Sequence, residues 1–473
     1  MKVGSQESGV RRQESGGKKS RRYAVGSRRK NSFFNSTFRI PYSAFFLLLA
    51  VYCLLLTEVH AEEKTITLQD ACRSAISTYE SLMLSQEDLY QAEKGIDKAV
   101  SQLLPSITAD GNYIKYSESE TSGGFNTQPD NSSSFTLKLN QPLYSGGKEW
   151  SLWRQSKKKV ESSRHGVEAN KEGIILNVSK AYYGVLKAEK IVEIKEAALK
   201  RAMEQRRVAS TRFQVGDVTK AIVLRAESEV ANAEAEVATA KKDLFIARDR
   251  LARLIGISED FKVTSPDIQN IPEATIDKLI SLSLEKRRDY IQSRIDEEVA
   301  EEGILYARGN FLPSIRLEGV YSKKDQDPKS TLFNEESIYG GIIFTYPIFE
   351  GGLRKAELAE ANSKKRQTEL KRVSLKRDIE LGVKEAFRNL EVFNSIIKSY
   401  ERQLSFAEEN YNMVFKQFTY GLSTSVDVID ANSTLISSQS SLVNSRYDLQ
   451  IAIVELQKNA GILLENILGA DIK

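Results

Sequence analysis

The 473-residue sequence predicts an α+β membrane protein in which one structural unit is used twice. Three observations predict this class: glycine motifs recur at a fixed offset, very long helical patterns follow them, and four amphipathic strands are divided between the two halves. The glycine pairs that define the offset, each 205 residues apart (352 − 147, 421 − 216 and 461 − 256), are Gly147 and Gly352, Gly216 and Gly421, and Gly256 and Gly461. Because no insertion separates the copies over this stretch, we expect two halves of one body with long antiparallel coiled-coil helices.

The N-terminal segment 1–61 is predicted to be a signal peptide with a long basic leader. Residues 1–40 contain 11 Lys/Arg and 2 Asp/Glu, and residues 44–56 are apolar but too few to span a bilayer as a helix. A small residue, Ala61, ends the segment and marks the expected cleavage site. The mature chain is therefore expected to leave the cytoplasm. Its one cysteine, Cys72, would have no partner for an intramolecular disulfide.

The positive charge of the sequence belongs to this leader. The whole chain has 68 basic and 64 acidic residues, and removal of 1–61 leaves 57 basic (68 − 11) and 61 acidic (64 − 3) residues. A net charge of −4 gives no basis for a nucleic-acid partner.

The first repeat is predicted to span residues 62–256 and to contain a helix, two strands, a long helix and a return helix. The first helix covers 68–103, the long helix runs between Gly147 and Gly216, and the return helix reaches Ile255. At 1.5 Å per residue the long helix would extend about 100 Å. An irregular connector, 257–275, is expected in an equatorial region, and the second repeat with the C-terminal tail fills 276–473, beginning with a helix over 276–310.

Apolar residues in steps of three and four predict a coiled-coil seam on each long helix. In the first helix the seam is Ile174, Val178, Ala181, Val185, Ala188 and Val192. Its counterparts 205 residues later are also apolar: Ile379, Val383, Ala386, Leu390, Phe393 and Ile397. Each long helix is therefore expected to pack against a reversed partner.

Four strands are predicted from alternating apolar and polar residues, over 107–113, 135–139, 315–321 and 342–346. One face is apolar and the other mostly polar, as in a barrel with lipid outside and water inside. Trp150 and Trp153 follow a strand, where they could anchor at a membrane interface or serve as packing residues. Because the smallest membrane barrels need about eight strands, one chain cannot close a barrel and oligomerisation is expected.

The doubled order of motifs resembles the TolC family of outer-membrane efflux ducts over nearly all of the chain after Ala61. The motifs that carry the resemblance are Leu-Pro-Ser-Ile at 104–107 and 312–315, the Pro and Gly-Gly segments 141–147 and 346–352, and the helix reversal at 420–431. The resemblance implies a homotrimer whose chains share one 12-strand outer-membrane β-barrel and whose helices form a periplasmic α-barrel. It also implies outer-membrane lipid, a periplasmic adaptor (membrane fusion) protein and an inner-membrane pump or ABC transporter as partners.

The resemblance assigns adaptor-contact roles to two helix tips, Val215, Gly216 and Asp217 in the first half and Tyr420, Gly421 and Leu422 in the second. The family favours Val-Gly-Leu there, so Asp217 and Tyr420 depart from its pattern. The glycines also have a purely structural interpretation, since a tight reversal between helices requires them.

The resemblance further places Asp427 and Asp430 at an acidic periplasmic aperture. They lie three residues apart on one helical face and would form two acid rings in an oligomer. The alternative is a solvated face on which one acid favours the helix N-terminus. Because their first-half counterparts are Ile222 and Arg225, we hypothesise that Arg225 pairs with an acid of the aperture, Asp430 first, and helps to hold the closed state.

No catalytic, cofactor-binding or metal-binding motif is found in the sequence. The only histidine outside the leader, His165, lies on a charged helical segment. The predicted function is a passive outer-membrane channel of a tripartite efflux or type I secretion system, not an enzyme. The alternative, from another class, is a secreted coiled-coil structural or adhesive protein.

Overall fold

A computed structural model describes residues 64–123, 125–257, 261–266, 274–329 and 334–469. The predicted signal peptide lies outside the described residues. All of these described residues belong to a single compact unit. Within the described residues, no helix combines the length and the apolar character needed to cross a membrane.

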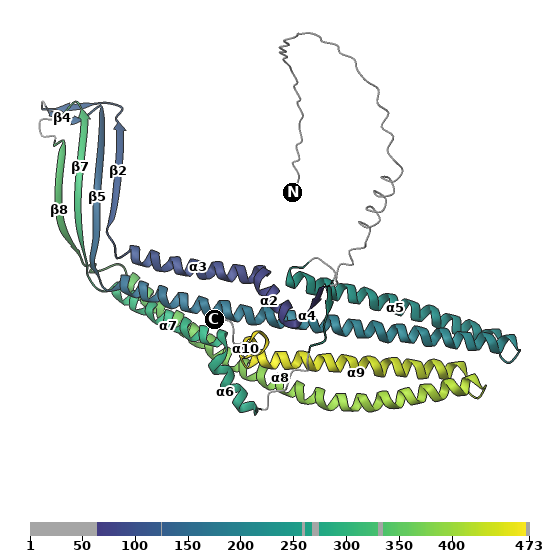
Figure 1. Cartoon of the computed structure of the whole chain (residues 1–473). Helices are drawn as coiled ribbons and strands as arrows, with labels where there is room; N and C mark the ends of the chain where they lie inside the picture. Colours follow the sequence, from purple (N-terminus) through teal and green to yellow (C-terminus); the bar gives the residue numbers. More distant parts are fainter. Residues whose placement is uncertain (1–63, 124, 258–260, 267–273, 330–333, 470–473) are drawn as a thin grey trace, which may run out of the picture. The chain divides into compact units, whose positions relative to one another are not determined.

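Two long helical hairpins dominate the structure (Figure 1). The first pairs α4 (Lys148–Gln214) with α5 (Lys220–Ile255), and the second pairs α8 (Leu353–Thr419) with α9 (Ser425–Asn459). α4 and α8 each contain 67 residues, and both ends are related by the same offset of 205 (353 − 148 and 419 − 214). The predicted seams are largely buried, with Ile174, Val178, Ile379 and Val383 all nearly inaccessible to solvent.

The two helices predicted to precede the strands are each broken, which corrects the continuous spans 68–103 and 276–310. α2 (Leu68–Thr78) gives way to α3 (Glu80–Ser101) at Tyr79, and α6 (Ile276–Lys286) gives way to α7 (Arg288–Gly309) at Arg287. Both break residues have extended backbone conformations, with ψ of 123°. The breaks are themselves related by an offset of 208 (287 − 79), so they belong to the repeated unit.

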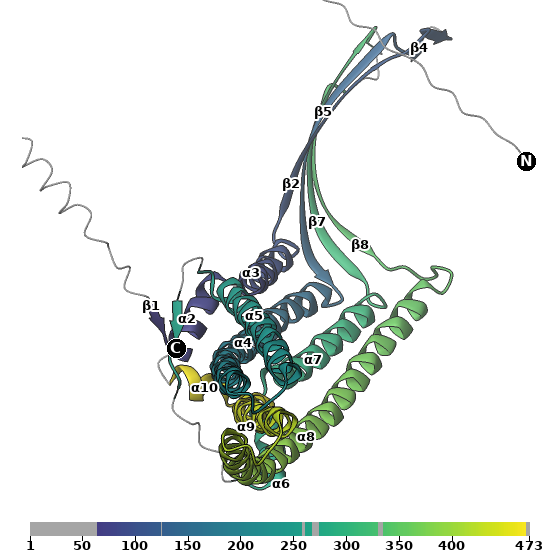
Figure 2. The same ribbon diagram turned by 90° about the vertical axis from the view of Figure 1, so that its right-hand side faces the viewer.

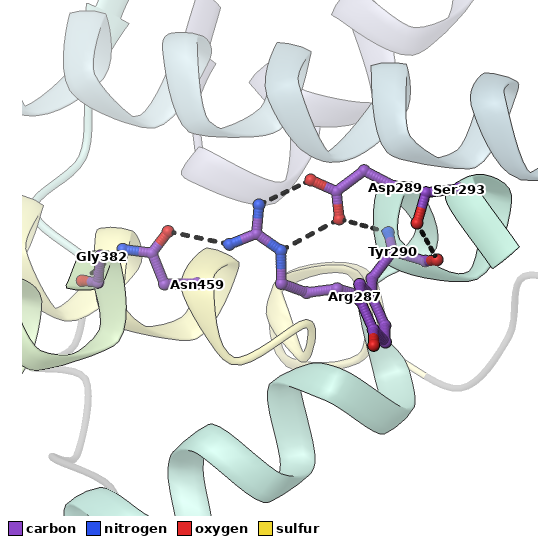
Figure 3. A network of polar contacts seen from close by, with 6 residues as sticks. All are labelled: Arg287, Asp289, Tyr290, Ser293, Gly382 and Asn459. Atoms are coloured by element: carbon purple, nitrogen blue, oxygen red, sulfur yellow. Dashed lines mark hydrogen bonds and ion pairs between the residues drawn. The ribbon is translucent and has the colours of Figure 1, made fainter. Parts of the chain in front are cut away.

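Hydrogen bonds between residues far apart in the sequence stabilise the second break, at Arg287 (Figure 3). The Arg287 guanidinium donates two hydrogen bonds to the Asp289 carboxylate, at 3.0 and 2.6 Å, and a third to Asn459 Oδ1 at 3.5 Å. Asn459 in turn donates to the Gly382 carbonyl at 3.1 Å. The break therefore joins α7 to the end of α9 and to α8. Burial alone would raise the pKa of Asp289, but the hydrogen bonds from Arg287, its charge and that of Lys458 together outweigh burial, so the pKa is lowered.

The four predicted strands form one antiparallel sheet in the order β2–β5–β7–β8 (Figure 2). Its members are β2 (Ser106–Lys115), β5 (Asn131–Ser145), β7 (Ser314–Asp327) and β8 (Glu336–Thr345). β2 and β8 are the outer strands of the sheet, so each has one edge that no strand among the described residues covers.

The register of the sheet separates an apolar face from a polar one. Ile107 pairs with Leu139, and Tyr321 pairs with Ile338, which places these residues on one exposed face. On the opposite face Lys138 Nζ lies 2.9 Å from Glu318 Oε2. This division is the one expected of a barrel segment with lipid on one side and water on the other.

Two further strand pairs were not predicted. β1 (Lys64–Ile66) pairs in parallel with β6 (Phe261–Val263). This pair corrects the expectation that the connector 257–275 is irregular throughout. In the segment between β2 and β5, β3 (Glu120–Ser122) pairs with β4 (Phe125–Gln128). The Tyr182 hydroxyl donates towards the Ile66 and Thr264 carbonyls, at 2.9 and 2.5 Å. This tyrosine fixes the first pair onto α4. A short helix, α10 (Leu463–Leu468), closes the same core.

Both tryptophans lie in the first turns of α4. Their rings form an edge-to-face pair with centroids 5.8 Å apart, and Lys157 Nζ lies 3.8 Å from the Trp153 ring centroid. The two rings pack on each other, but Trp150 is 54% exposed, so they are not buried packing residues of this chain. The packing role and the membrane-interface role both remain predictions.

Candidate functional site

The two hairpins end in turns of the same design. Gly216 and Gly421 have φ of +78° and +83°, a left-handed conformation that glycine adopts without strain. The amide of Asp217 donates to the Arg212 carbonyl at 2.8 Å, and the amide of Leu422 donates to the Gln417 carbonyl at 2.9 Å. These bonds satisfy the last carbonyls of α4 and α8, so the structural role of the glycines is present.

The turns also expose apolar side chains. Val215 is 76% exposed, Tyr420 73% and Leu422 79%. Asp217 is exposed as well, but its carboxylate is engaged within its own turn, with Oδ2 2.6 Å from Arg212 Nε. The first tip therefore presents one apolar residue and a paired charge, whereas the second presents two apolar residues.

Arg212 connects the two tips, a role that the sequence reasoning missed. Its Nη1 donates to the Phe418 carbonyl at 2.7 Å, and its guanidinium carbon lies 5.2 Å from the centroid of the Phe418 ring. Its side chain is only 14% exposed. A guanidinium with several directed donors can bind the carboxylate of one hairpin and the carbonyl of the other at once. A usable sequence signal was that the counterpart of Arg212, Gln417, cannot do the same.

Two more polar side chains of α4 contact the second hairpin. Arg201 Nε donates to Asn432 Oδ1 at 2.7 Å, and Gln205 Nε2 lies 3.3 and 3.1 Å from the carbonyl and hydroxyl of Ser425. The Arg201 guanidinium also lies 5.6 Å from the Tyr411 ring centroid, and burial lowers its pKa. These contacts surround an apolar cluster formed by α4, α5, α8 and α9. The two hairpins of one chain are therefore firmly packed near their tips.

Asp427 caps the start of α9. Its Oδ2 accepts from the Thr424 amide at 2.8 Å, from the Thr424 hydroxyl at 2.7 Å and from the Ser423 hydroxyl at 3.1 Å. The Thr424 hydroxyl accepts in return from the Asp427 amide, completing a capping box. Hydrogen bonds from the Thr424 side chain and backbone, followed by that from Ser423, lower the pKa of Asp427. The N-terminal role is therefore present, and the carboxylate remains exposed and charged.

The first repeat lacks this cap. Thr219 precedes α5 but makes no side-chain cap, and Ile222, at the position of Asp427 (427 − 205), has no carboxylate to complete a capping box. The two hairpins therefore begin their return helices with different charge.

Asp430 and Arg225 are both exposed, and neither makes an ion pair with any of the residues described in this single chain. The hypothesised contact between them is thus not formed within one chain. A contact between neighbouring copies remains a hypothesis. No group of three His, Cys, Asp or Glu side chains among the described residues could hold a metal ion.

Comparison with known proteins places this geometry in a family. The profile described as outer membrane efflux protein matches the chain twice, over residues 73–257 and 279–461. The chain belongs to this family. The outer membrane protein TolC of Escherichia coli is 24% identical over 409 residues, which cover 82% of this chain and 81% of that protein.

Other relatives share most of their length with the chain. The alkaline protease secretion protein AprF of Pseudomonas aeruginosa is 22% identical over 372 residues, covering 77% of each protein. The crystal structure of the Campylobacter jejuni CmeC outer membrane channel superimposes with a TM-score of 0.73 at 19% identity, covering 84% of this chain and 86% of that one. The predicted fold class is confirmed, with a helical barrel continued by strands.

Family membership also confirms the predicted function class and location. This outer membrane efflux protein is a channel of the outer membrane, with its helical part in the periplasm. The alternative, a secreted coiled-coil structural or adhesive protein, is set aside.

Proposed function

We propose that this chain is the outer-membrane conduit of a tripartite efflux or type I secretion system and conducts substrates passively. The observation that carries the proposal is the pair of 67-residue helices, each leading from the sheet to a tip with exposed apolar residues. Such a helix bridges about 100 Å. An inner-membrane pump or ABC transporter would deliver substrates to the mouth of the conduit.

In this proposal residues 1–61 direct export, 62–256 and 276–473 are the two repeats, and 257–275 is the connector. Three copies would supply 12 strands from the four of each chain, enough to close a membrane barrel. Relatives named for efflux and for protease secretion support both system types.

The tips would bind a periplasmic adaptor. Val215, Tyr420 and Leu422 offer apolar side chains, while Gly216 and Gly421 leave backbone accessible. Asp217 would contribute through its pairing with Arg212 rather than as a free charge. The departure from Val-Gly-Leu therefore preserves a docking surface of low net charge.

The aperture would be formed by Asp427 and Asp430, repeated around the oligomer. Rings of carboxylates concentrate cations at a pore mouth and disfavour anions. Arg225 would pair with Asp430 of a neighbouring copy and help to hold the closed state.

Single-channel conductance in a planar bilayer tests this proposal. We expect a small, cation-preferring conductance from the mature wild type, and a larger, less selective one from the variant Asp427→Ala plus Asp430→Ala. The matched control is Glu87→Ala plus Asp88→Ala, which removes two exposed carboxylates from α3, the helix that leads into the sheet. Absence of conductance from folded protein would overturn the conduit, and equal effects of both double variants would overturn the aperture.

Arg225→Ala provides a separate test of the latch. If Arg225 holds the closed state, the variant leaks more current at rest than the wild type. An unchanged closed-state leak would show that Arg225 has no such role.

A further inference from the structure

A groove of about 600 Å³ runs along α7, between α4 and α8. α7 packs against both of these helices (Figure 2). Small or aliphatic residues of all three helices line the groove: Leu152 of α4, Ala300, Gly303 and Ala307 of α7, and Ala361 of α8. Cavities of this volume with a mainly apolar lining are typical of sites that bind small molecules. The whole groove is built by one chain.

The acidic side chains of α7 hold the walls of the groove in place. Four ion pairs join glutamates of α7 to its two neighbours: Glu302 with Arg154 and Glu298 with Lys158 of α4, and Glu301 with Lys365 and Glu297 with Arg372 of α8. None of these four glutamates lines the groove. The pairs therefore fix α4 and α8 to α7 and keep four negative charges away from the groove.

The carboxylates that do line the groove already have partners. These contacts are Asp296 with the Ser162 hydroxyl at 2.6 Å, Glu357 with the Asn310 amide at 2.8 Å, and Glu360 with Lys364 Nζ at 2.6 Å. Lys371 also lines the groove, and its side chain makes no ion pair or hydrogen bond with any residue that the structure describes. The charge left without a partner in the groove is therefore positive.

Lys371 lies at the end of the groove that is farther from the sheet. The lining residues of α8 begin at Glu357 and end at Lys371, 14 positions later (371 − 357), which corresponds to about 21 Å along the helix. Lys159 of α4 is at the same end as Lys371, since its Nζ lies 3.8 Å from Asp296 Oδ1 near the start of α7. The groove is thus long and mainly apolar, with two ammonium groups at one end.

This distribution of charge selects a class of ligand. An ammonium group without a partner favours a carboxylate, and an apolar lining favours a hydrocarbon chain that leaves water. A neutral molecule would leave Lys371 unused, and a cation would be repelled by it. A phospholipid has two chains and needs about twice the apolar room of one chain. A single-chain amphipathic anion satisfies both ends of the groove.

We propose that the groove between α4, α7 and α8 binds a long-chain carboxylate, with its head group at Lys371 and its hydrocarbon chain along Gly303 and Ala361 towards Leu152. The binding is reversible and involves no covalent step. This site goes beyond the conduit function and depends neither on conduction nor on the oligomeric state.

Photolabelling tests the site in the full chain. The detergent-solubilised protein is illuminated with a long-chain fatty acid that carries a diazirine on its chain, at a pH that keeps the carboxylate ionised. Labelled peptides are then identified by mass spectrometry. We expect label on the peptides that contain Gly303 and Ala361. Label on β5, whose apolar face is covered by detergent in every variant, serves as the internal standard.

Two substitutions on α8 test the two ends of the ligand. Lys371→Gln should lower the labelling of the groove relative to β5 about twofold to fivefold, the range expected for one exposed ion pair. Ala361→Trp should fill the groove and lower its labelling about tenfold, because the indole occupies the place of the chain. The matched controls are Lys355→Gln and Ala359→Trp, at exposed positions of α8 outside the groove, and should label like the wild type. Unchanged labelling in Lys371→Gln and Ala361→Trp, or equal losses in the controls, would overturn the site.

Two further probes test the chemistry of the ligand. A fatty alcohol with the same diazirine chain should label the groove less than the acid does, and Lys371→Gln should not change its labelling. A phospholipid that carries the same chain should label β5 but not the groove. Equal labelling by acid and alcohol would overturn the assignment of a carboxylate, and labelling of the groove by the phospholipid would overturn the assignment of a single chain. None of these outcomes bears on the conduit, which the conductance measurement tests separately.

Discussion

Replacing Arg212 by glutamine should loosen the connection between the two tips of a chain. The guanidinium donates to the Phe418 carbonyl at 2.7 Å, and Phe418 is almost fully buried. A hydrogen bond from a charged donor contributes about 1.5–3 kcal/mol. The ion pair with Asp217, whose side chain is 54% exposed, adds about 1 kcal/mol at most and lies within the first hairpin only. Loss of about 2 kcal/mol corresponds to an approximately 30-fold increase in local opening.

Hydrogen–deuterium exchange measures this opening without any partner protein. In Arg212→Gln we expect faster exchange of the amides in residues 417–424 at an unchanged melting temperature. The matched control is Arg207→Gln, which removes an ion pair between Arg207 and Glu204 that lies on α4 alone. If both variants exchange like the wild type at the second tip, Arg212 does not connect the hairpins.

Three further predictions concern a helix cap, the exposed carboxylate of Asp427 and the buried carboxyl group of Glu172. Thr424→Ala should destabilise the start of α9 by about 1 kcal/mol, because the Thr424 side chain caps this helix. Thr219→Ala should have little effect, because the Thr219 side chain makes no such cap at α5. Chemical denaturation compares the stability of the two variants. Cation preference should persist as the pH falls to about 4, close to the ordinary pKa of an aspartate, because hydrogen bonds from Thr424, followed by that from Ser423, lower the pKa of Asp427. Reversal potentials in an Asp430→Asn background measure this, and loss of the preference above about pH 4 would contradict it. Burial, followed by the charge of Asp289, raises the pKa of Glu172 from 4.5 to about 7. Since the unfolded chain releases this proton first, stability should fall as the pH rises from 4.5 to about 7 and then level off, by up to about 3 kcal/mol. Glu172→Gln should remove that fall in pH-dependent melting, and an unchanged pH profile would refute the assignment.

The repeat made the long helices predictable from the sequence. α4 and α8 begin after Gly147 and Gly352 and end before the turns at Gly216 and Gly421, as the glycine offset required. Helix length follows from uninterrupted apolar periodicity, which is a local property. The four strands were located for the same reason, because alternation over a few residues is visible without tertiary information.

The breaks in the shorter helices were not predictable in this way. Neither Tyr79 nor Arg287 is a proline or glycine, so no local signal marks the end of a helix there. The conformation at Arg287 is held by Asn459, which lies 172 residues later in the chain. A Cβ atom on Gly461 would lie 2.9 Å from the Arg287 amide nitrogen, so this glycine also belongs to the break. The determinant is tertiary packing, which overrides helix propensity.

In the candidate site, too, local features could be predicted and long-range contacts could not. The cap formed by Thr424 and Asp427 is encoded in neighbouring residues. Asp427 itself was singled out through the resemblance to the TolC family. Arg201 and Arg212 were missed because their partners are 231 and 206 residues away. Contacts of that separation cannot be read from periodicity or from a single motif.

The two halves have kept their length while their contact residues have diverged, and helix geometry explains why. Adding one residue to either long helix would advance its tip by about 1.5 Å and rotate everything beyond it by about 100°. Such a change would misplace the second tip relative to the first. Substitution carries no such penalty, provided that each contact keeps a complementary partner. Arg201 with Tyr411 satisfies this condition within the chain. A constant offset with differing side chains is therefore what a requirement on helix length, rather than on residue identity, would leave in the sequence.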